Sequence, residues 1–264
     1  MFRGLSLAAV VLAGLVESAA PTTAGENPPA PGFKLEASDP EAVEIADQVM
    51  ERLGGRDAWD RTRFVTWNFF GRRRHVWDKY TGDVRIEGVE RDSDKPYIIL
   101  MNLHTQQGRA WSAGEEITDT DELATMLDAG ESAWINDSYW VFMPYKLKDT
   151  GVTLEYLGEG TMVDGRSAEV LQLTFEGVGR TPQNKYLVYV ARETGLVEQW
   201  DFFADAGDEE PRFQIPWHNW QRYGEILLSD DRGDSDHTDI AVFAQLPEEV
   251  LLSPEPVNWD KLIP

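Results

Sequence analysis

The spacing of hydrophobic positions changes along the chain and separates helical from extended segments. Over residues 40–53, hydrophobic side chains recur every three or four positions, which is typical of a helix with one apolar face. Asp39 is expected to cap this helix, and Pro40 suits its first turn. Gly54 and Gly55 are expected to end it, because glycine adopts left-handed backbone conformations without strain. A short helical turn is predicted next, over residues 57–61.

From residue 63 onward the hydrophobic period becomes two. Val65, Trp67 and Phe69 alternate with polar residues, which indicates a strand with one buried face. Further strands are predicted at residues 74–80, 84–90, 97–104 and 109–112. The segments between them are short and rich in turn-forming residues, so the pattern favours an antiparallel meander.

A helical and strongly aromatic segment interrupts the strands. A helix is predicted to begin at Thr118 or Asp119, to break at Gly130, and to resume through the sequence "YWVFMPY" that ends at Tyr145. A soluble protein rarely exposes so many adjacent apolar side chains. The segment therefore either fills an internal hollow or marks a surface for an apolar partner.

A second series of strands is predicted after residue 151, at residues 152–157, 168–175, 185–191, 196–203, 217–228 and 238–246. The glycines at residues 158–160 and 177–179 are expected in hairpin turns. A sheet of about eleven strands accumulates twist and must curl. The predicted fold is therefore mainly β (α+β): a strongly curved antiparallel open half-barrel that wraps the N-terminal helix and the central helical insert.

The N-terminal residues resemble an export signal. Arg3 precedes an apolar run over residues 5–16, and small residues follow, so a signal peptide is predicted over residues 1–24. The apolar run is too short for an ordinary membrane span, although an uncleaved anchor is the alternative interpretation. A proline-rich lead-in at residues 25–38 is expected to be disordered, and residues 39–264 are expected to form a single domain.

Composition narrows the compartment and the partners. The mature chain has no further segment apolar enough to cross a membrane, and without cysteine it can form neither a disulfide nor an N-terminal lipid anchor. A periplasmic or secreted location is therefore predicted. The 47 acidic residues outnumber the 24 basic residues and give a net charge of −23, which repels nucleic acid.

Four stretches resemble a known family: "YWVFMPYKLKDTGVTLEYLG", "TFEGVGRTPQNKYLVYV", "GLVEQWDFF" and "NWQRYGEILLSDDR". Together with the signal peptide and the order of elements, they are similar to an uncharacterised, outer-membrane lipoprotein-sorting-like branch of the periplasmic lipoprotein-carrier (Lol-type) superfamily. The resemblance covers residues 40–254. It implies a half-open barrel around helices, with a hydrophobic cavity able to hold acyl chains. The cavity-arginine motif of established carriers has no clear counterpart here.

Two groups of residues are candidates for ligand contact. An apolar cavity is predicted to be lined by Trp67, Phe69, Trp77, Trp111, Trp140, Phe142, Met143 and Trp200. The alternative is that these side chains fill a closed core. Arg72, Arg73 and Arg74 could hold an anionic head group, because guanidinium groups suit phosphate and carboxylate. The alternative is that they pair with surface carboxylates.

No catalytic residue, metal site or cofactor is predicted. The acidic residues between 230 and 239 lack the spacing of an EF-hand, the four histidines lie far apart, and no G-x-S-x-G motif occurs. The predicted function is an exported, non-enzymatic binding or carrier protein for an apolar or acyl-bearing ligand, namely a lipid or a lipoprotein acyl chain. Two alternatives stay open: an exported hydrolase that uses cavity carboxylates, and a ligand-free structural or interaction domain.

Overall fold

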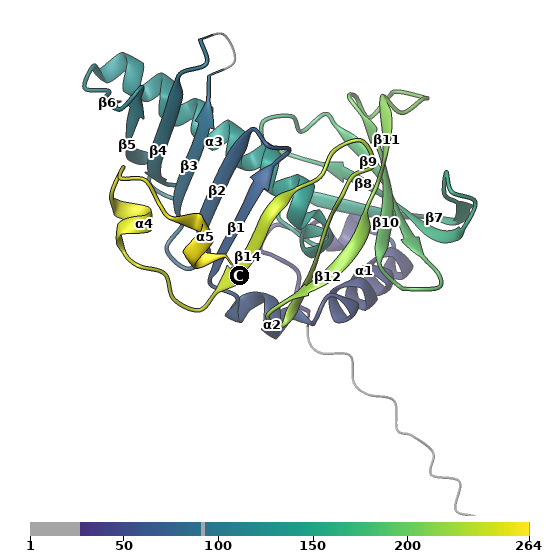
Figure 1. Ribbon diagram of the computed structural model, residues 1–264. Coiled ribbons are helices and arrows are strands. Elements are labelled where there is room, and N and C mark those ends of the chain that lie inside the picture. The colour runs from purple at the N-terminus through teal and green to yellow at the C-terminus, as the bar shows by residue number, and fades with distance from the viewer. Residues whose placement is uncertain (1–26, 91–92, 264) are drawn as a thin grey trace, which may run out of the picture.

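The computed structural model describes residues 27–90 and 93–263 (Figure 1). The strands in this part of the chain form open antiparallel sheets around helices. The prediction of a mainly β, open antiparallel half-barrel of the α+β class is therefore confirmed. The signal peptide predicted over residues 1–24 lies outside the described residues.

A seven-stranded sheet forms one wall, and its strands run in the order β14-β1-β2-β3-β4-β5-β6. They are β1 (Phe64–Phe69), β2 (Arg73–Asp78), β3 (Asp83–Val89), β4 (Pro96–Asn102), β5 (Gln107–Ser112), β6 (Glu115–Glu116) and β14 (Thr238–Phe243). Strands β1 to β5 follow one another as a meander, as the sequence predicts, and the short β6, which the sequence pattern does not predict, extends it. Strand β14 returns from the far end of the sequence and pairs with β1, so the two halves of the chain share this sheet.

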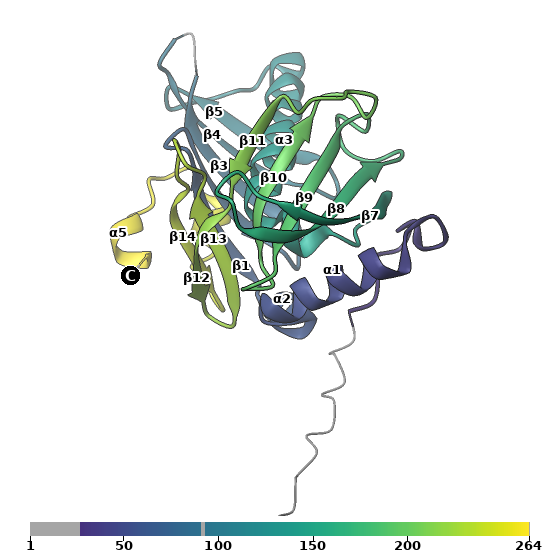
Figure 2. The same ribbon diagram turned by 90° about the vertical axis from the view of Figure 1, so that its right-hand side faces the viewer.

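A five-stranded sheet forms the opposite wall, in the order β11-β10-β9-β8-β7, and Figure 2 shows it from the front. Its strands are β7 (Val152–Thr161), β8 (Ser167–Phe175), β9 (Lys185–Ala191), β10 (Val197–Phe203) and β11 (Phe213–Pro216). A separate hairpin of β12 (His218–Tyr223) and β13 (Ile226–Asp231) lies between the walls (Figures 1 and 2).

The structure corrects two strand predictions. Residues 217–228, expected as one strand, contain most of two strands, because the chain reverses at Gly224 in a two-residue turn with φ of 60°. Gly158, expected in a hairpin turn, lies inside β7 instead. It has φ of 93° at a shift in the pairing with β8, so the glycine permits a β-bulge rather than a reversal.

The central helix α3 (Thr120–Phe142) is continuous, and it leads directly into the 3-10 helix η2 (Met143–Lys146). The side chain of Asp119 caps α3 by accepting from the backbone N–H groups of Asp121 and Glu122, at 3.1 and 3.0 Å. Gly130 does not break the helix as expected. A Cβ at this position would lie 3.0 Å from Ile99 Cδ1, so the glycine lets α3 pack closely on β4.

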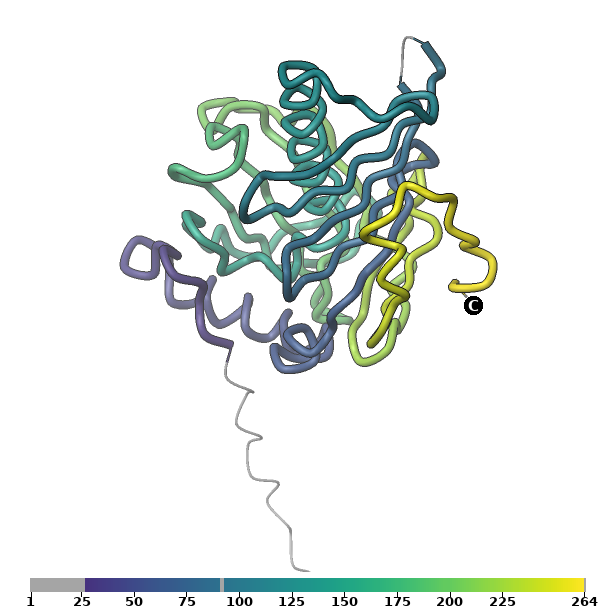
Figure 3. Tube along the Cα trace, turned by 90° about the vertical axis from the view of Figure 1, so that its left-hand side faces the viewer, coloured from purple at the N-terminus to yellow at the C-terminus, as the bar shows by residue number. Residues whose placement is uncertain are grey.

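Not all of the remaining helices lie outside the sheets, because the helix that begins at Pro40 buries Ala42 and Val49 in the main hydrophobic core. These helices are η1 (Leu35–Ala37), α1 (Pro40–Arg52), α2 (Arg56–Arg61), α4 (Glu249–Leu252) and α5 (Trp259–Leu262). Figures 1 and 3 show α3 on one side of the seven-stranded sheet and the C-terminal segment with α4 and α5 on the other. The buried Arg85 fixes that C-terminal segment by donating to the carbonyl oxygens of Val250 and Ser253, at 3.1 and 2.6 Å.

Residues 27–38, expected to be disordered, pack along the domain. The N–H of Ala30 donates to Lys148 O at 2.9 Å, the N–H of Lys34 donates to Val152 O at 3.0 Å, and Phe33 is buried. Asp39 precedes α1 as expected, but its carboxylate accepts from the Tyr156 N–H at 2.9 Å rather than from the helix. The physical reason is that β7 is an edge strand, whose unpaired backbone groups this segment satisfies.

Candidate functional site

An open cleft of about 580 Å³ lies between the second half of α3 and the concave side of the five-stranded sheet. Helix α3 contributes Trp134, Ile135, Tyr139 and Trp140, while the sheet contributes Tyr186, Trp200 and Phe213, among other residues. The volume lies within the range of small-molecule binding sites, which are typically concave and mostly apolar.

Aromatic contacts hold the wall of the cleft in place. The ring centroids of Trp140 and Trp200 are 4.9 Å apart with an interplanar angle of 76°, and Tyr139 stacks on Trp200 at 5.9 Å. Trp140 also stacks on Phe213 of β11 at 5.8 Å. The carbonyl of Trp140 accepts from Arg232 Nη2 at 2.7 Å, which fixes this end of α3 against the loop after β13. The wall is therefore preformed by contacts among its own residues.

Three buried donors on residues of this cleft lack a hydrogen-bond partner among the described residues: Trp134 Nε1, Tyr139 Oη and Trp200 Nε1. Burial raises the pKa of Tyr139 well above its usual value, so its hydroxyl keeps its proton and can donate. A buried polar group without a partner costs about 1–3 kcal/mol. These donor atoms are closed off from the cleft surface, so a side chain has to turn before an oxygen of a bound ligand can accept from them.

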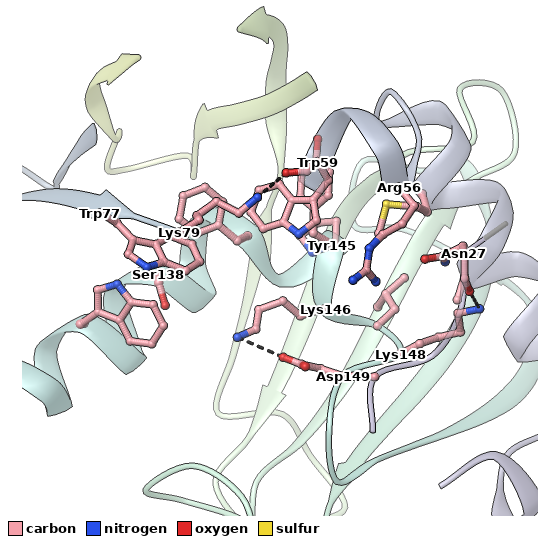
Figure 4. Close-up of a pocket in the computed structure, with 17 residues that line it drawn as sticks. Asn27, Arg56, Trp59, Trp77, Lys79, Ser138, Tyr145, Lys146, Lys148 and Asp149 are labelled. Carbon is pink, nitrogen blue, oxygen red and sulfur yellow. Dashed lines mark hydrogen bonds and ion pairs between the residues drawn. The ribbon is translucent and has the colours of Figure 1, made fainter. Parts of the chain in front are cut away.

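A smaller pocket of about 200 Å³ adjoins the cleft (Figure 4). Both hollows are lined by Trp134, Ser138, Lys146 and Asp149, so these four residues lie between them. The smaller pocket is basic, with one carboxylate (Asp149) and four cationic side chains on its lining: Arg56, Lys79, Lys146 and Lys148.

The four cations differ in how they are paired. Lys148 pairs with Asp47, and Lys146 Nζ lies 3.1 Å from Asp149 Oδ2. Arg56 donates through Nε to both carboxylate oxygens of Asp60, at 2.8 and 2.9 Å. Figure 4 shows Arg56 extending toward Tyr145 and Lys146, and Lys148 pointing away toward Asn27.

Lys79 is the exception among these cations, because no carboxylate of the described chain lies within ion-pair distance. Its ammonium group donates to the carbonyl oxygen of Trp59 and lies 3.5 Å from the centroid of the Trp59 ring (Figure 4). Burial of the amine lowers the pKa of Lys79 to about 7, which the nearby Asp60 only partly offsets. This side chain is therefore a desolvated amine at the edge of a basic pocket.

The sequence-predicted aromatic residues do not all reach a hollow. Trp140 and Trp200 line the cleft, and Trp77 and Phe142 line the smaller pocket. Phe69 packs beside His237, with ring centroids 5.6 Å apart, and borders neither hollow.

Trp67, Met143 and Trp111 also lie away from both hollows. Trp67 and Met143 are fully buried in the main hydrophobic core, as the filled-core alternative expects. Trp111 is a correction, because its neighbour Ala110 faces the cluster under α3 and alternation turns Trp111 to the other side of the sheet. There the guanidinium of Arg109 lies 4.7 Å from the centroid of its ring.

The three consecutive arginines also point in different directions, which corrects the expectation of one head-group cluster. Arg73 faces inward and pairs with Asp137, Arg74 faces outward and pairs with Asp239, and Arg72 is exposed in the β1–β2 turn. Successive residues of a strand project to opposite faces, so an unbroken run cannot form one cationic surface. The cations that do gather come from three segments that are distant in sequence, which contain Arg56, Lys79, and Lys146 with Lys148.

A buried network joins α3 to β2 beside the cleft. Asp137 receives two hydrogen bonds from Arg73, at 2.7 and 2.8 Å, and one from His75 Nε2 at 2.8 Å. Burial opposes ionisation of Asp137, but the hydrogen bonds from His75 and Arg73 outweigh it and lower its pKa. Desolvation lowers the pKa of His75, so the ring is neutral and donates to a carboxylate. The network positions α3, and with it Trp140.

Residues 27–90 and 93–263 contain no group of three or more His, Cys, Asp or Glu side chains placed to hold a metal ion. No helix within these ranges combines the length and the apolar character that crossing a bilayer requires. Among the described residues, Asp149 is the one carboxylate on either lining, and it lines both hollows.

No family model matches the sequence, and no curated protein matches it either. Among solved structures, the chain is similar to a DUF1329 family protein from Desulfovibrio piger, with 15% identity, a TM-score of 0.43, and coverage of 81% of this chain and 98% of the other. An uncharacterized conserved protein from Thermus thermophilus has 12% identity and a TM-score of 0.28, with 83% and 96% of the two chains covered.

The chain also resembles part of the MucA/MucB complex of Pseudomonas aeruginosa, with 19% identity and a TM-score of 0.24. In that match, 62% of this chain and 53% of the other are covered. These three TM-scores lie below 0.5, so the similarities do not assign a family or an activity.

Proposed function

We propose that this protein is an exported, non-enzymatic binding protein that holds an apolar or acyl-bearing ligand, such as a lipid or a lipoprotein acyl chain. The observation that carries the proposal is the open aromatic cleft of about 580 Å³ beside α3. Each CH₂ group of a ligand that leaves water for such a surface contributes about 0.8 kcal/mol. A chain of about ten buried carbons would therefore supply enough free energy for firm binding.

The polar atoms of the cleft fit an acyl ligand better than a pure hydrocarbon. Trp134, Tyr139 and Trp200 each carry a buried donor without a partner in the described structure. An ester, amide or carboxyl oxygen could accept from one of these donors. A hydrogen bond to that donor would remove the cost of burying it without a partner, which is about 1–3 kcal/mol.

The other two interpretations from the sequence gain less support. A hydrolase that relies on cavity carboxylates would have one carboxylate at hand, Asp149, which is ion-paired with Lys146. A ligand-free interaction domain needs no cleft of this size, and it predicts that the purified protein carries no small molecule.

Native mass spectrometry of the gently purified protein tests the proposal. We expect a population heavier than the polypeptide. Organic extraction should release an amphiphile whose mass equals the difference between this population and the polypeptide. A protein of polypeptide mass alone, which also fails to bind added dodecanol or laurate, would overturn the proposed function.

A matched pair of variants locates the ligand. Ile135 lines the cleft but is absent from the buried clusters, so Ile135→Glu should place a charge in the cleft without disturbing the core. Val163 is 73% exposed and lies outside both hollows, so Val163→Glu is the control. We expect at least a tenfold loss of laurate affinity in Ile135→Glu and no change in Val163→Glu. Equal affinities in the two variants would contradict the assignment of the cleft.

A further inference from the structure

We infer that the smaller basic pocket binds an anionic head group, so that the ligand class is a long-chain amphiphile with a carboxylate or phosphate at one end. The inference rests on the proposed function, because the chain of this ligand would occupy the aromatic cleft. It also moves the head-group site from the three arginines expected from the sequence to Arg56, Lys79 and Lys146.

The two hollows are placed for one ligand. They share Trp134 and Ser138 of α3, and also Lys146 and Asp149, as parts of their linings. The cleft is the larger and more apolar of the two, with Arg180 and the shared Lys146 as its cations, while four cations line the smaller pocket. A ligand that extends from the cleft into the smaller pocket would therefore place its chain against mostly apolar side chains. Its head group would lie beside the cations of the smaller pocket.

The charge of the smaller pocket differs from that of the whole chain. The protein has a net charge of −23, yet four cations and one carboxylate line this pocket. Long-range repulsion opposes the approach of anions, so local contacts must carry any anion binding here. Three of these cations have a carboxylate partner in the described structure, so the charge left over at the pocket is that of Lys79, which a negative group would neutralise.

Two of the cations in the smaller pocket, Arg56 and Lys79, can still donate hydrogen bonds to a ligand. The described structure uses only Nε of Arg56 in a hydrogen bond, to Asp60, and it pairs neither of the terminal guanidinium nitrogens. Lys79 has a carbonyl oxygen and an aromatic ring as neighbours, where a buried ammonium would ordinarily have a carboxylate. An anion between these side chains would supply the missing counter-charge.

The third cation can exchange its partner. Lys146 and Asp149 form an ion pair whose side chains are 31% and 39% exposed, and exposed pairs contribute at most about 1 kcal/mol. A head group could therefore compete with Asp149 for Lys146 at little cost. Lys148 is different, because it is 7% exposed and is held by Asp47 and the Asn27 carbonyl, so we assign it a structural role.

The test compares three ligands with the same twelve-carbon chain: laurate, monododecyl phosphate and dodecanol. Dissociation constants measured by titration calorimetry at pH 6.5 should be at least tenfold lower for the better of the two anions than for dodecanol. Whichever anion binds more tightly identifies the chemistry of the head group.

The double variant Arg56→Gln with Lys79→Gln should bring the affinity of both anions down to that of dodecanol, and should leave dodecanol binding within twofold of wild type. The control is Arg72→Gln with Lys95→Gln, which removes the same two charges from exposed positions outside the pocket. This control should keep the preference for anions. Because Arg56 is partly exposed and Lys79 is costly to bury, the double variant should unfold at no lower urea concentration than wild type.

Each outcome decides the inference. Equal binding of all three ligands by the wild type would overturn the head-group site and leave the proposed function standing. A loss of anion preference in the control variant as large as in the pocket variant would also overturn the site. If none of the three ligands binds, the proposed function itself fails, and the head-group site fails with it.

Discussion

At the scale of single residues, buried polar side chains position the wall of the cleft. Asp137 ties α3 to β2 through Arg73 and His75, and Arg232 donates to the carbonyl of Trp140. Both connections are inside the domain, where an unpaired polar group is costly. Local polar contacts therefore decide where the aromatic side chains of α3 stand.

Replacement of Asp137 by Asn should be strongly destabilising. The side chain is fully buried, and its loss of charge leaves Arg73 without its counter-ion. We expect a loss of about 3 kcal/mol in the free energy of unfolding, measured by urea denaturation at pH 7. Asp128→Asn on the same helix is the control, because Asp128 is 65% exposed in its pair with Arg180 and should change stability by less than about 0.5 kcal/mol. Equal effects of the two changes would contradict the structural role of Asp137.

His237 should make the protein sensitive to acid. Burial, with the nearby Arg232, lowers the pKa of His237 to about 3, and neither ring nitrogen has a partner among the described residues. The unfolded chain binds a proton near the ordinary pKa of 6.5 while the folded chain does not, so stability falls as the pH drops from 6.5 toward 3. The ring of His237 stacks on Phe70 at 4.5 Å, which a phenyl ring can reproduce.

His237→Phe should therefore lose less stability than wild type between pH 7 and pH 4, by about 3 kcal/mol. Urea denaturation at the two pH values measures the difference. The exposed His104 provides the control, and His104→Gln should follow the wild-type pH dependence. If the free energy of unfolding of His237→Phe changed with pH as it does in wild type, the imidazole of His237 would not take up a proton on unfolding.

Lys79 should make anion binding depend on pH. With its pKa lowered to about 7 by burial, Lys79, which lies near Asp60 and Arg56, loses its charge above neutral pH. The affinity for dodecanesulfonate, whose charge is constant, should fall as the pH rises from 6 to 9. Calorimetry on Lys79→Gln should show weaker binding that no longer changes with pH; an unchanged slope would exclude Lys79 from the site.

At the scale of elements, the end of α1 is joined closely to the β12–β13 hairpin. The N–H of Leu227 donates to Leu53 O at 2.9 Å, and the hydroxyl of Tyr145 lies 2.7 Å from Leu227 O and 3.0 Å from Leu53 O, so it donates between the two segments. Tyr145 also stacks on Trp59 at 4.3 Å, which links α2 to the basic pocket. The ends of these elements thereby fix the position of the smaller pocket.

Gly54 and Gly55 provide a matched test of this junction. Both have positive φ, of 117° and 88°, so an alanine is strained at either position. A Cβ at Gly54 would lie 2.3 Å from the backbone oxygen of Glu225, whereas a Cβ at Gly55 has nothing within 4 Å. We expect Gly55→Ala to cost about 1–3 kcal/mol and Gly54→Ala to cost clearly more. Thermal unfolding measures both, and equal losses would show that α1 and β13 can separate without cost.

At the scale of the whole molecule, two sheets and a long helix enclose a core that is filled near β1 and open beside the five-stranded sheet. Trp67 and Trp200 are both buried, yet only Trp200 borders the cleft. The open volume is therefore a property of the way the two walls and α3 meet, and no single element contains it.

The excess of negative charge should destabilise the folded state at low ionic strength. Folding brings the like charges behind the net charge of −23 closer together, and salt screens the resulting repulsion. Raising NaCl from about 20 to 200 mM should increase the unfolding temperature by about 2–4 °C, which corresponds to about 1 kcal/mol. Calorimetry should show that the gain saturates with ionic strength; a gain that grows linearly with salt would indicate ion exclusion rather than screening.

The sequence by itself determined those features that depend on neighbouring residues. The alternation at Val65, Trp67 and Phe69 predicted β1, and Asp119 predicted the start of α3, because strand pleating and helix capping act over a few positions. A predominance of short strands also predicted the curved antiparallel architecture. Local chemistry did not reveal the turn at Gly224, since two residues interrupt an otherwise continuous alternation.

Only the tertiary structure decided which predicted contacts exist. It separated Arg73 from Arg74, turned Trp111 away from α3, and brought Arg56, Lys79 and Lys146 to one pocket from three distant segments. The sequence pattern also missed the packing of residues 27–38 on the edge of β7. The physical reason is that a hollow and its charge arise where surfaces far apart in sequence meet. Hydrophobic spacing encodes which face of an element is buried, but not what that face will touch.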